Sequence, residues 1–177
     1  MVVEAKEDLQ SRVVTTVADS VLRLYYNGNL NGKGKRITVY ITCPDLRSLQ
    51  ASGASVIQGS SAFTVSDLEL HLSGGSSLKL KLQATKLVVE AAGAGVITLE
   101  GKADNQRVQL SGASHYDASQ LESKSVEINA SGASVVKIAV ENELKAGLTG
   151  ASTLHYQGNP TVRQLKPTGI SIITSSD

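Results

Sequence analysis

The amino-acid sequence predicts an all-β fold, a right-handed parallel β-helix (β-solenoid) whose coils are about 19 residues long. Three observations carry this prediction. A four-residue motif recurs seven times, its second residue is always glycine, and apolar residues alternate with polar ones on both sides of it. The chain has 177 residues, enough to bury one substantial core. We therefore expect a single domain of stacked coils.

The motif reads Ser-Gly-Ala-Ser in its commonest form, and successive copies begin 18 to 21 residues apart. The copies begin at Ser52, Ser73, Ala92, Ser111, Ser131, Thr149 and, more loosely, Thr168. Glycine at a fixed place in each copy indicates a corner that needs a positive φ. We assign this structural role to the corner glycines Gly53, Gly74, Gly93, Gly112, Gly132 and Gly150. Stacked corners would place Ser52, Ser73, Ser111 and Ser131 in a hydroxyl ladder near one edge.

The segments on both sides of the motif have the period of β-strands. Before it, segments such as Leu68-Glu-Leu-His-Leu72 place apolar residues at every second position. After it, one shared offset is held by Ile57, Leu78, Ile97, Tyr116, Val136 and Leu154. A strand with one apolar face must bury that face, so each coil should stack on the next at about 4.8 Å. Each repeat is expected to be a strand, a corner, a second strand and a short connection, and the right hand follows from the rule for parallel crossovers.

The two ends of the chain lack the regular motif. In residues 1–45 we expect the opening strands of the same domain, at 12–17, 21–26 and 36–42, with a hairpin loop through Asn27-Gly28 and Asn31–Gly34. Residues 46–177 form the repeat solenoid. Its end, after Gly158-Asn-Pro160, is expected to be an irregular C-terminal cap that keeps an open strand edge from pairing.

These residues resemble a known family. The shared features are the Ser-Gly-Ala-Ser corners, the segment Tyr40-Ile-Thr-Cys-Pro-Asp-Leu46, and the ending Tyr156-Gln-Gly-Asn-Pro160 with Thr168-Gly-Ile-Ser171. Over residues 2–173 the chain resembles the "putative auto-transporter adhesin, head GIN" domain family, common in Bacteroidetes. The resemblance implies a right-handed β-helix on an exported, often lipid-anchored protein of the cell envelope, in the periplasm or at the outer membrane and cell surface. It implies no catalytic residues. Members usually begin with an export signal, and we expect that segment to be missing from this chain.

Composition excludes several partners. Lys plus Arg is 17 and Asp plus Glu is 16, so the net charge of +1 offers no field for a nucleic acid or an anionic membrane. The aromatic fraction of 3% is too low for a base-stacking or sugar-stacking surface. No apolar run in the chain as given reaches the length of a membrane span. Cys43 is the single cysteine and is expected to be a half-buried strand residue.

One outward-facing group stands out as a weak polar cluster, formed by Glu69, His71 and Glu90. Glu69 and His71 point the same way on one strand, and Glu90 follows His71 one coil later, about 5 Å away by strand spacing. The three histidines occupy different offsets, so we expect no metal site and no cofactor. Glu69 and Glu127 share an outward column but are three coils apart, too far for a glycosidase pair. Arg107 with Glu127, and Lys137 with Asp117, are expected to form cross-coil ion pairs.

The sequence therefore predicts a non-catalytic surface module of the cell envelope, an adhesin-type or structural binding domain. Its partner would be an unknown surface ligand, a glycan or a protein. Two alternatives stay open. The solenoid could self-associate end to end into filaments through its strand edges, or it could be a polysaccharide-active β-helix enzyme.

Overall fold

The computed structural model of the chain describes residues 1–28 and 36–176, which divide into two compact units, Met1–Pro44 and Asp45–Asp177. The first unit contains one short helix and four strands: β1 (Val2–Ala5), α1 (Glu7–Gln10), β2 (Val13–Ala18), β3 (Val21–Tyr26) and β4 (Ile37–Tyr40). β1 pairs with β4 and β2 pairs with β3, both antiparallel. The sequence predicts three of these strands, whereas β1 and α1 are additional. That both units form one domain stays a prediction.

The hairpin of the first unit lies earlier than expected. β2 and β3 are joined by Asp19 and Ser20, both with positive φ, as in a two-residue type I′ turn. We expected the hairpin loop at 27–34, because Asn-Gly is the stronger turn signal, and residues 29–34 of that loop lie outside the described residues. Cys43 is partly buried, but it follows the end of β4 instead of lying within a strand.

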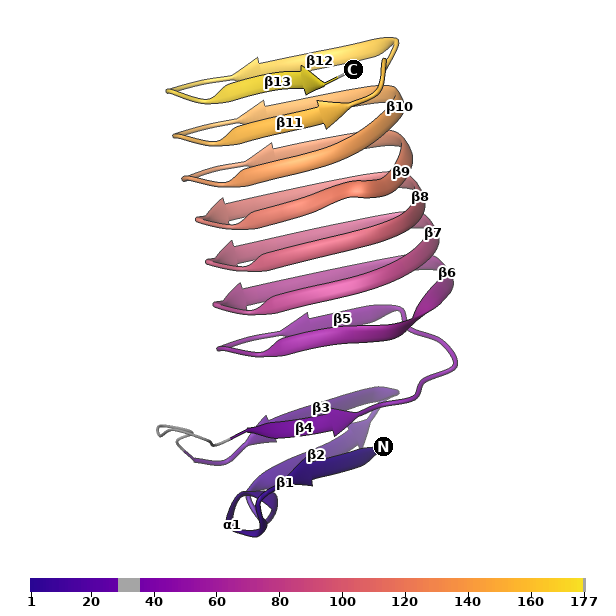
Figure 1. The fold of residues 1–177 in the computed structure, drawn as a ribbon, viewed down its shortest axis with the longest axis vertical. Helices are drawn as coiled ribbons and strands as arrows, with labels where there is room; N and C mark the ends of the chain where they lie inside the picture. Colours follow the sequence, from indigo (N-terminus) through magenta and orange to yellow (C-terminus); the bar gives the residue numbers. More distant parts are fainter. Residues whose placement is uncertain (29–35, 177) are drawn as a thin grey trace. The chain divides into compact units, whose positions relative to one another are not determined.

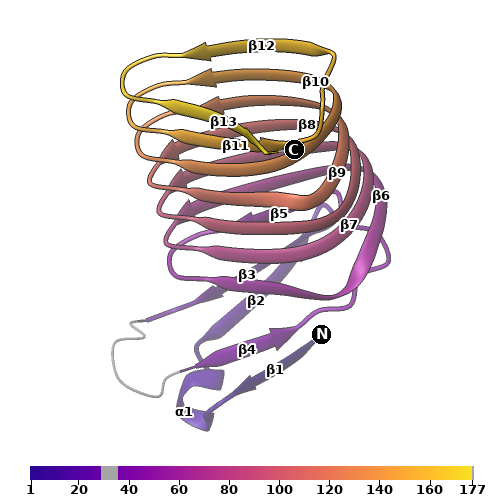
Figure 2. The ribbon, with the colours of Figure 1, turned by 45° about the horizontal axis from the view of Figure 1, so that its top comes forward.

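The second unit is a stack of parallel strands (Figures 1 and 2). Its strands follow one another in the sheet in chain order, from β5 to β11 and then β13, while β12 also pairs with β10. In Figure 1 the near strands run to the right and the far strands to the left as the chain rises, which is the predicted right-handed sense. The bounds are β5 (Ser48–Ala51), β6 (Val56–Gly74), β7 (Ser77–Gly93), β8 (Val96–Gly112), β9 (His115–Ala130), β10 (Val135–Leu148), β11 (Thr153–Gln157), β12 (Val162–Pro167) and β13 (Ile172–Ser176).

The register brings equivalent residues of successive coils into columns, as the repeat predicts. One interior column, on the strands before the corner, runs through Leu70, Val89, Val108, Ile128 and Ala146. Another, after the corner, runs through Leu78, Ile97, Tyr116, Val136 and Leu154. All of these side chains are buried in one apolar cluster. Burial of these columns is the main favourable contribution to the stack.

Backbone hydrogen bonds stack each corner on the preceding one. The N–H of the third motif residue donates to the carbonyl of the preceding corner glycine, with an N···O distance of 2.8 Å at Gly75, Ala94 and Ala113. The fourth motif residue supplies a buried hydroxyl ladder that donates to the carbonyl of the first, at Ser76, Ser114, Ser134 and Ser152. The first motif position, where we expected the ladder, is exposed, but Ser111 and Ser131 there also donate to carbonyls of the preceding coil, those of Ala91 and Leu110, at 3.4 and 3.3 Å.

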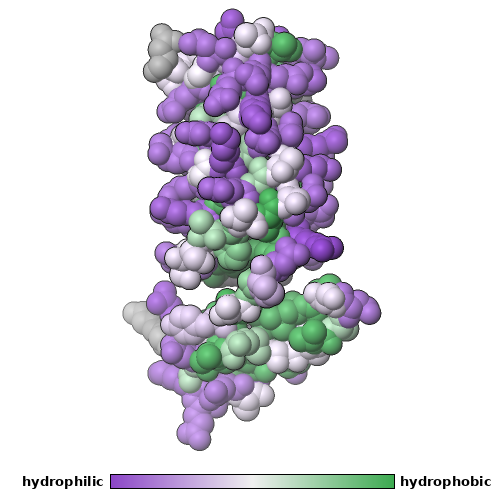
Figure 3. Space-filling view, turned by 90° about the vertical axis from the view of Figure 1, so that its right-hand side faces the viewer, coloured by the Kyte–Doolittle hydropathy of each residue, from purple (hydrophilic) through white to green (hydrophobic). Residues whose placement is uncertain are grey.

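Opposite the corners, each coil bends without leaving the sheet. Strands β6 to β10 are 14 to 19 residues long and run from one corner to the next. We expected short connections in these places. Instead, each strand bends while its backbone stays paired with the next coil. The register shifts at Thr98/Glu100 and Ile138/Ala139, whereas β7 and β8 stay in continuous register through the bend. Figure 3 looks onto this side of the β6–β10 coils and shows mostly hydrophilic side chains.

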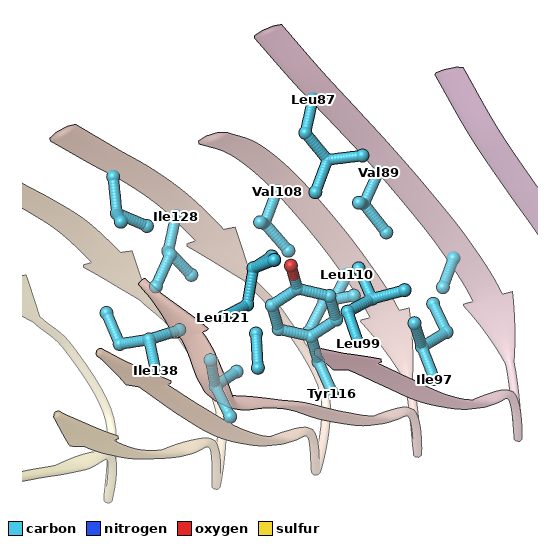
Figure 4. Close-up of a cluster of buried hydrophobic side chains, with 14 of the residues drawn as sticks. Leu87, Val89, Ile97, Leu99, Val108, Leu110, Tyr116, Leu121, Ile128 and Ile138 are labelled. Atoms are coloured by element: carbon cyan, nitrogen blue, oxygen red, sulfur yellow. The ribbon is translucent and has the colours of Figure 1, made fainter. Parts of the chain in front are cut away.

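One polar group lies inside the aliphatic interior. Figure 4 shows the Tyr116 ring packed among interior side chains that include Leu99, Leu110 and Leu121. The Tyr116 hydroxyl, fully buried, donates to Gln106 Oε1 at 2.7 Å, and Gln106 Nε2 donates to Ser123 Oγ. Burial raises the pKa of Tyr116 far above its ordinary value. Within the described residues, no buried side-chain nitrogen or oxygen atom lacks a hydrogen-bond partner.

The last coil is more regular than its sequence suggests. β12 pairs with β10 and β13 with β11 in continuous register, and Gly169 repeats the positive φ of the earlier corners. Gly158, Pro160 and Pro167 lead us to expect irregularity, but the coil beneath supplies the pairing that sets the backbone. Its function as a cap stays a prediction.

Candidate functional site

The predicted polar cluster is assembled on the outer face of the strands that precede the corners. β6 carries Glu69 and His71, and β7 places Glu90 in register with His71. His71 Nδ1 lies 3.1 Å from Glu90 Oε2, and His71 Nε2 lies 3.6 Å from Glu69 Oε2. The imidazole therefore sits between two carboxylates, closer to Glu90 than strand spacing alone suggests. This geometry requires only that the strands alternate and the coils stay in register.

The cluster is open to solvent. The side chains of His71, Glu90 and Glu69 are 32%, 50% and 59% exposed. Ion pairs with this exposure contribute little to folding stability, because water screens the charges. Across the described residues, no group of three His, Cys, Asp or Glu side chains is arranged to hold a metal ion. A functional role for Glu69, His71 and Glu90 stays a prediction.

We expect Glu69→Ala to change the free energy of unfolding by less than about 0.5 kcal/mol, because the pair that it removes is exposed and longer than the His71–Glu90 contact. Urea unfolding followed by circular dichroism measures this change. Glu90→Ala, which removes the shorter contact, is the companion variant. A loss of more than about 2 kcal/mol in Glu69→Ala would show that the cluster is structural.

The two expected cross-coil ion pairs differ. Arg107 Nη2 lies 3.8 Å from Glu127 Oε1, as expected. Asp117 and Lys137 are in register, but Asp117 Oδ1 accepts hydrogen bonds from the Ser119 hydroxyl at 2.6 Å and the Ser119 N–H at 3.1 Å. Desolvation acts to raise the pKa of Asp117, and these hydrogen bonds together with the charges of Lys137 and His115 outweigh it and lower the pKa below the ordinary value. Asp117 is therefore held as a carboxylate by a local partner.

The structure also shows a hollow that the sequence did not reveal. It lies on the outer face after the corners, over β9, β10, β11 and β13, has a volume of about 450 Å³ and is open to solvent. Its lining residues are Ser119, Lys137, Ile138, His155, Gln157 and Ser176. His155 Nδ1 is hydrogen-bonded to the Thr174 hydroxyl. The hollow therefore gathers an ammonium group, an imidazole, an amide and hydroxyls.

A small residue beside two lining residues is a signal in the sequence for this place, although it does not itself line the hollow. Ala139 faces Glu122 on one neighbouring coil and Gln157 on the other. Ala139 follows the lining residue Ile138 and has a shorter side chain than either of its partners. The signal is hidden in the sequence, because the register of β10 shifts beside Ala139 and between Val140 and Glu143, so the repeat spacing does not align this position with its neighbours.

Comparisons with known proteins agree with the geometry. The family described as "Putative auto-transporter adhesin, head GIN domain" matches residues 1–160. Among curated proteins there is no match. In the described part of the chain, no helix is long and apolar enough to cross a membrane.

Three solved structures share the fold. A putative adhesin from Bacteroides fragilis is 22% identical with a TM-score of 0.91, over 98% of this chain and 81% of that one. A putative adhesin from Parabacteroides merdae is 21% identical with a TM-score of 0.77, over 99% and 82%. A protein described as a putative lipid binding protein, from Parabacteroides distasonis, is 20% identical with a TM-score of 0.71, over 97% and 82%. At these identities the likeness concerns the fold alone.

Proposed function

The chain belongs to the "Putative auto-transporter adhesin, head GIN domain" family, and on this premise we propose that it is a non-catalytic binding module of the cell envelope that holds surface ligands on the outer faces of its coils. The observation that carries the proposal is the division between a packed interior and polar faces. The interior columns are buried, and the outward columns carry side chains of both charges. Binding would therefore occur on the outside of the stack.

The faces are suited to weak, repeated contacts. Each coil presents its outward side chains one strand spacing, about 4.8 Å, from those of the next coil, and the paired backbone holds them in place. A polymer with repeating polar groups could contact several coils at once, which raises its overall affinity without any tight single site. The shortage of aromatic side chains favours ionic and hydrogen-bonding contacts over stacking.

Retention on surface polymers tests this function. The purified chain, immobilised on fluorescent beads, should be retained by polysaccharide-coated or cell-coated surfaces in a saturable way, and the soluble chain should compete. Heat-unfolded chain on the same beads is the control. In cells that produce the protein naturally, we expect added protease to cleave it, either in intact cells or once the outer membrane has been permeabilised. Cleavage in either case would place the protein in the envelope. Protection from protease in both cases, or no retention above the control, contradicts the proposal.

The enzyme alternative makes a separate prediction. A polysaccharide-active enzyme would release reducing ends or unsaturated products from a polysaccharide, and Glu69→Gln or Glu90→Gln would abolish the release. We expect no product. Product formation that depends on either residue would replace the binding proposal with the enzyme.

The filament alternative rests on the last coil. Within the described residues, β12 and β13 pair only with the strands below them, and Val162, Leu165, Ile170 and Ile172 are 45%, 36%, 78% and 56% exposed. An exposed strand edge with apolar neighbours is a template for pairing with another chain. Filaments would give light scattering that grows with protein concentration, whereas a constant monomer mass removes this alternative.

A further inference from the structure

We propose that the hollow over β9, β10, β11 and β13 binds an acidic sugar residue, a uronate, of a surface polysaccharide. This inference rests on the proposed binding function and assigns it a site and a ligand class. The hollow lies within the size range of ligand sites, about 300–1,000 Å³, although it is open on one side. Its volume is sufficient for a single sugar ring, one face of which would stay in solvent.

The charge that a ligand would meet is set by one column. Asp117, Lys137, His155 and Thr174 follow one another in register on β9, β10, β11 and β13. Asp117 is held by Ser119 on its own strand. The ammonium of Lys137 lines the hollow and is therefore available to a ligand carboxylate. Binding that carboxylate would weaken only the longer-range attraction between Lys137 and Asp117.

The neutral groups suit hydroxyls. Thr174 Oγ1 donates to the Leu154 carbonyl at 3.5 Å, so its lone pairs can accept from His155 Nδ1–H. In that tautomer Nε2 is left as an acceptor for a ligand hydroxyl. The Gln157 amide both donates and accepts, and the Ser119 hydroxyl is committed to Asp117. The hollow therefore offers one cation beside several hydroxyl partners.

This set favours one class of ligand. A phosphate dianion carries two negative charges, and Lys137 would neutralise only one of them. The nearby Asp117 carboxylate would repel the other. A neutral sugar would leave Lys137 without a partner. A simple carboxylate such as acetate would leave the imidazole and the amide unused. A uronate carries one carboxylate and several hydroxyls and can satisfy all of these groups, without the aromatic platform that the hollow lacks among its lining residues.

The experiment is a titration of ¹⁵N-labelled full chain with sodium glucuronate, followed by amide chemical shifts. Glucose and sodium acetate are titrated in parallel as probes of the hydroxyls and of the carboxylate alone. We expect saturable shifts with glucuronate, confined to the residues around Ser119, Lys137, His155 and Gln157. Both reference compounds should bind at least about tenfold more weakly.

Three variants test the site. Lys137→Gln removes the cation, and Ala139→Gln adds a long side chain beside the lining residues Ile138 and Gln157, where it can cover the hollow. Each should weaken glucuronate binding at least about tenfold. Lys79→Gln is the matched control, because Lys79 lies in the same outward column but pairs with Glu100 at 3.3 Å, away from the hollow. Its affinity for glucuronate should equal that of the wild type. If the amide spectrum shows that Ala139→Gln does not fold, the test is the comparison of glucuronate affinity between Lys137→Gln and Lys79→Gln.

Several results would overturn the assignment. These are the absence of saturable shifts, acetate binding as tightly as glucuronate, and glucuronate affinity that survives both Lys137→Gln and Ala139→Gln. The two proposals fail separately. Beads that are retained by surface polymers when glucuronate does not bind would refute the hollow and leave the surface function intact. The surface function would be refuted instead if glucuronate binds at the hollow but the beads are not retained above the control, or the protein in cells is protected from protease.

Discussion

Gly132→Val should destabilise the coil stack by more than about 4 kcal/mol, the largest effect that we expect from one substitution. Gly132 has a φ of +86°, where an L side chain is strained. A Cβ atom there would also overlap the carbonyl oxygen of Gly112 in the preceding coil. That oxygen cannot move away, because it accepts the Ala133 N–H at 2.8 Å. Urea unfolding measures the loss.

Substitutions at two other corner positions separate the backbone strain from the overlap with the preceding coil. Gly53 has a similar φ of +72°, but no atom lies within 4 Å of the place that a Cβ would take, so Gly53→Ala should cost only the strain, about 1–2 kcal/mol. Gly95 occupies the fourth motif position, where a Cβ would be in ordinary contact, 3.7 Å from the Ser76 carbonyl oxygen. Gly95→Ser should therefore cause no loss, and its hydroxyl can join the buried ladder. Equal losses at Gly53 and Gly132 would refute the overlap as the main cause.

Gln106→Leu should destabilise the fold by about 1–3 kcal/mol, although it places an aliphatic residue in an aliphatic column. Gln106 lies between Leu87 and Val126 in that column and is 3% exposed. Its loss leaves the buried Tyr116 hydroxyl without the acceptor that it now reaches at 2.7 Å. Ser123 keeps an acceptor in the Leu121 carbonyl, so the cost comes from Tyr116. The free energy of unfolding is again the measurement.

The control is to remove both partners. Tyr116→Phe alone should cost a similar amount, because it leaves Gln106 Oε1 unpaired inside the core. The double variant Gln106→Leu with Tyr116→Phe removes the hydroxyl and the amide together, and we expect it to be more stable than either single variant. A double variant that loses the sum of the two single losses would show that the polar network is not a coupled unit.

The repeat was sufficient to predict the second unit. Alternation with period two and glycine every 18 to 21 residues indicate strands and corners directly, because both depend on local backbone geometry. The same register predicts that Glu90 follows His71, and the two side chains are in contact at 3.1 Å. The apolar columns follow for the same reason, since each strand has one face that must be buried.

Predictions that depended on a break in the pattern were less successful. The stretches between successive strands of the repeat read as connections but are bent strands, and the last coil reads as irregular but is in register. In both places the coil beneath supplies hydrogen-bonding partners, so tertiary pairing overrides the local signal. In the first unit, Asn27-Gly28 predicts a hairpin between the strands at 21–26 and 36–42, but β3 pairs with β2 through the turn at Asp19 and Ser20, and β4 pairs with β1.

The sequence by itself determined the solenoid, its corners, its buried columns and the contact between His71 and Glu90. These features repeat, and a repeated feature can be read without knowing how distant segments meet. Only the tertiary structure decided where the register shifts. Those shifts place Ala139 between Glu122 and Gln157. The tertiary structure also gathers Lys137 and His155 at one hollow and brings Gln106 to Tyr116 across the core. A one-residue shift changes which side chains are neighbours, and its position depends on packing between coils, which the sequence of one coil does not contain.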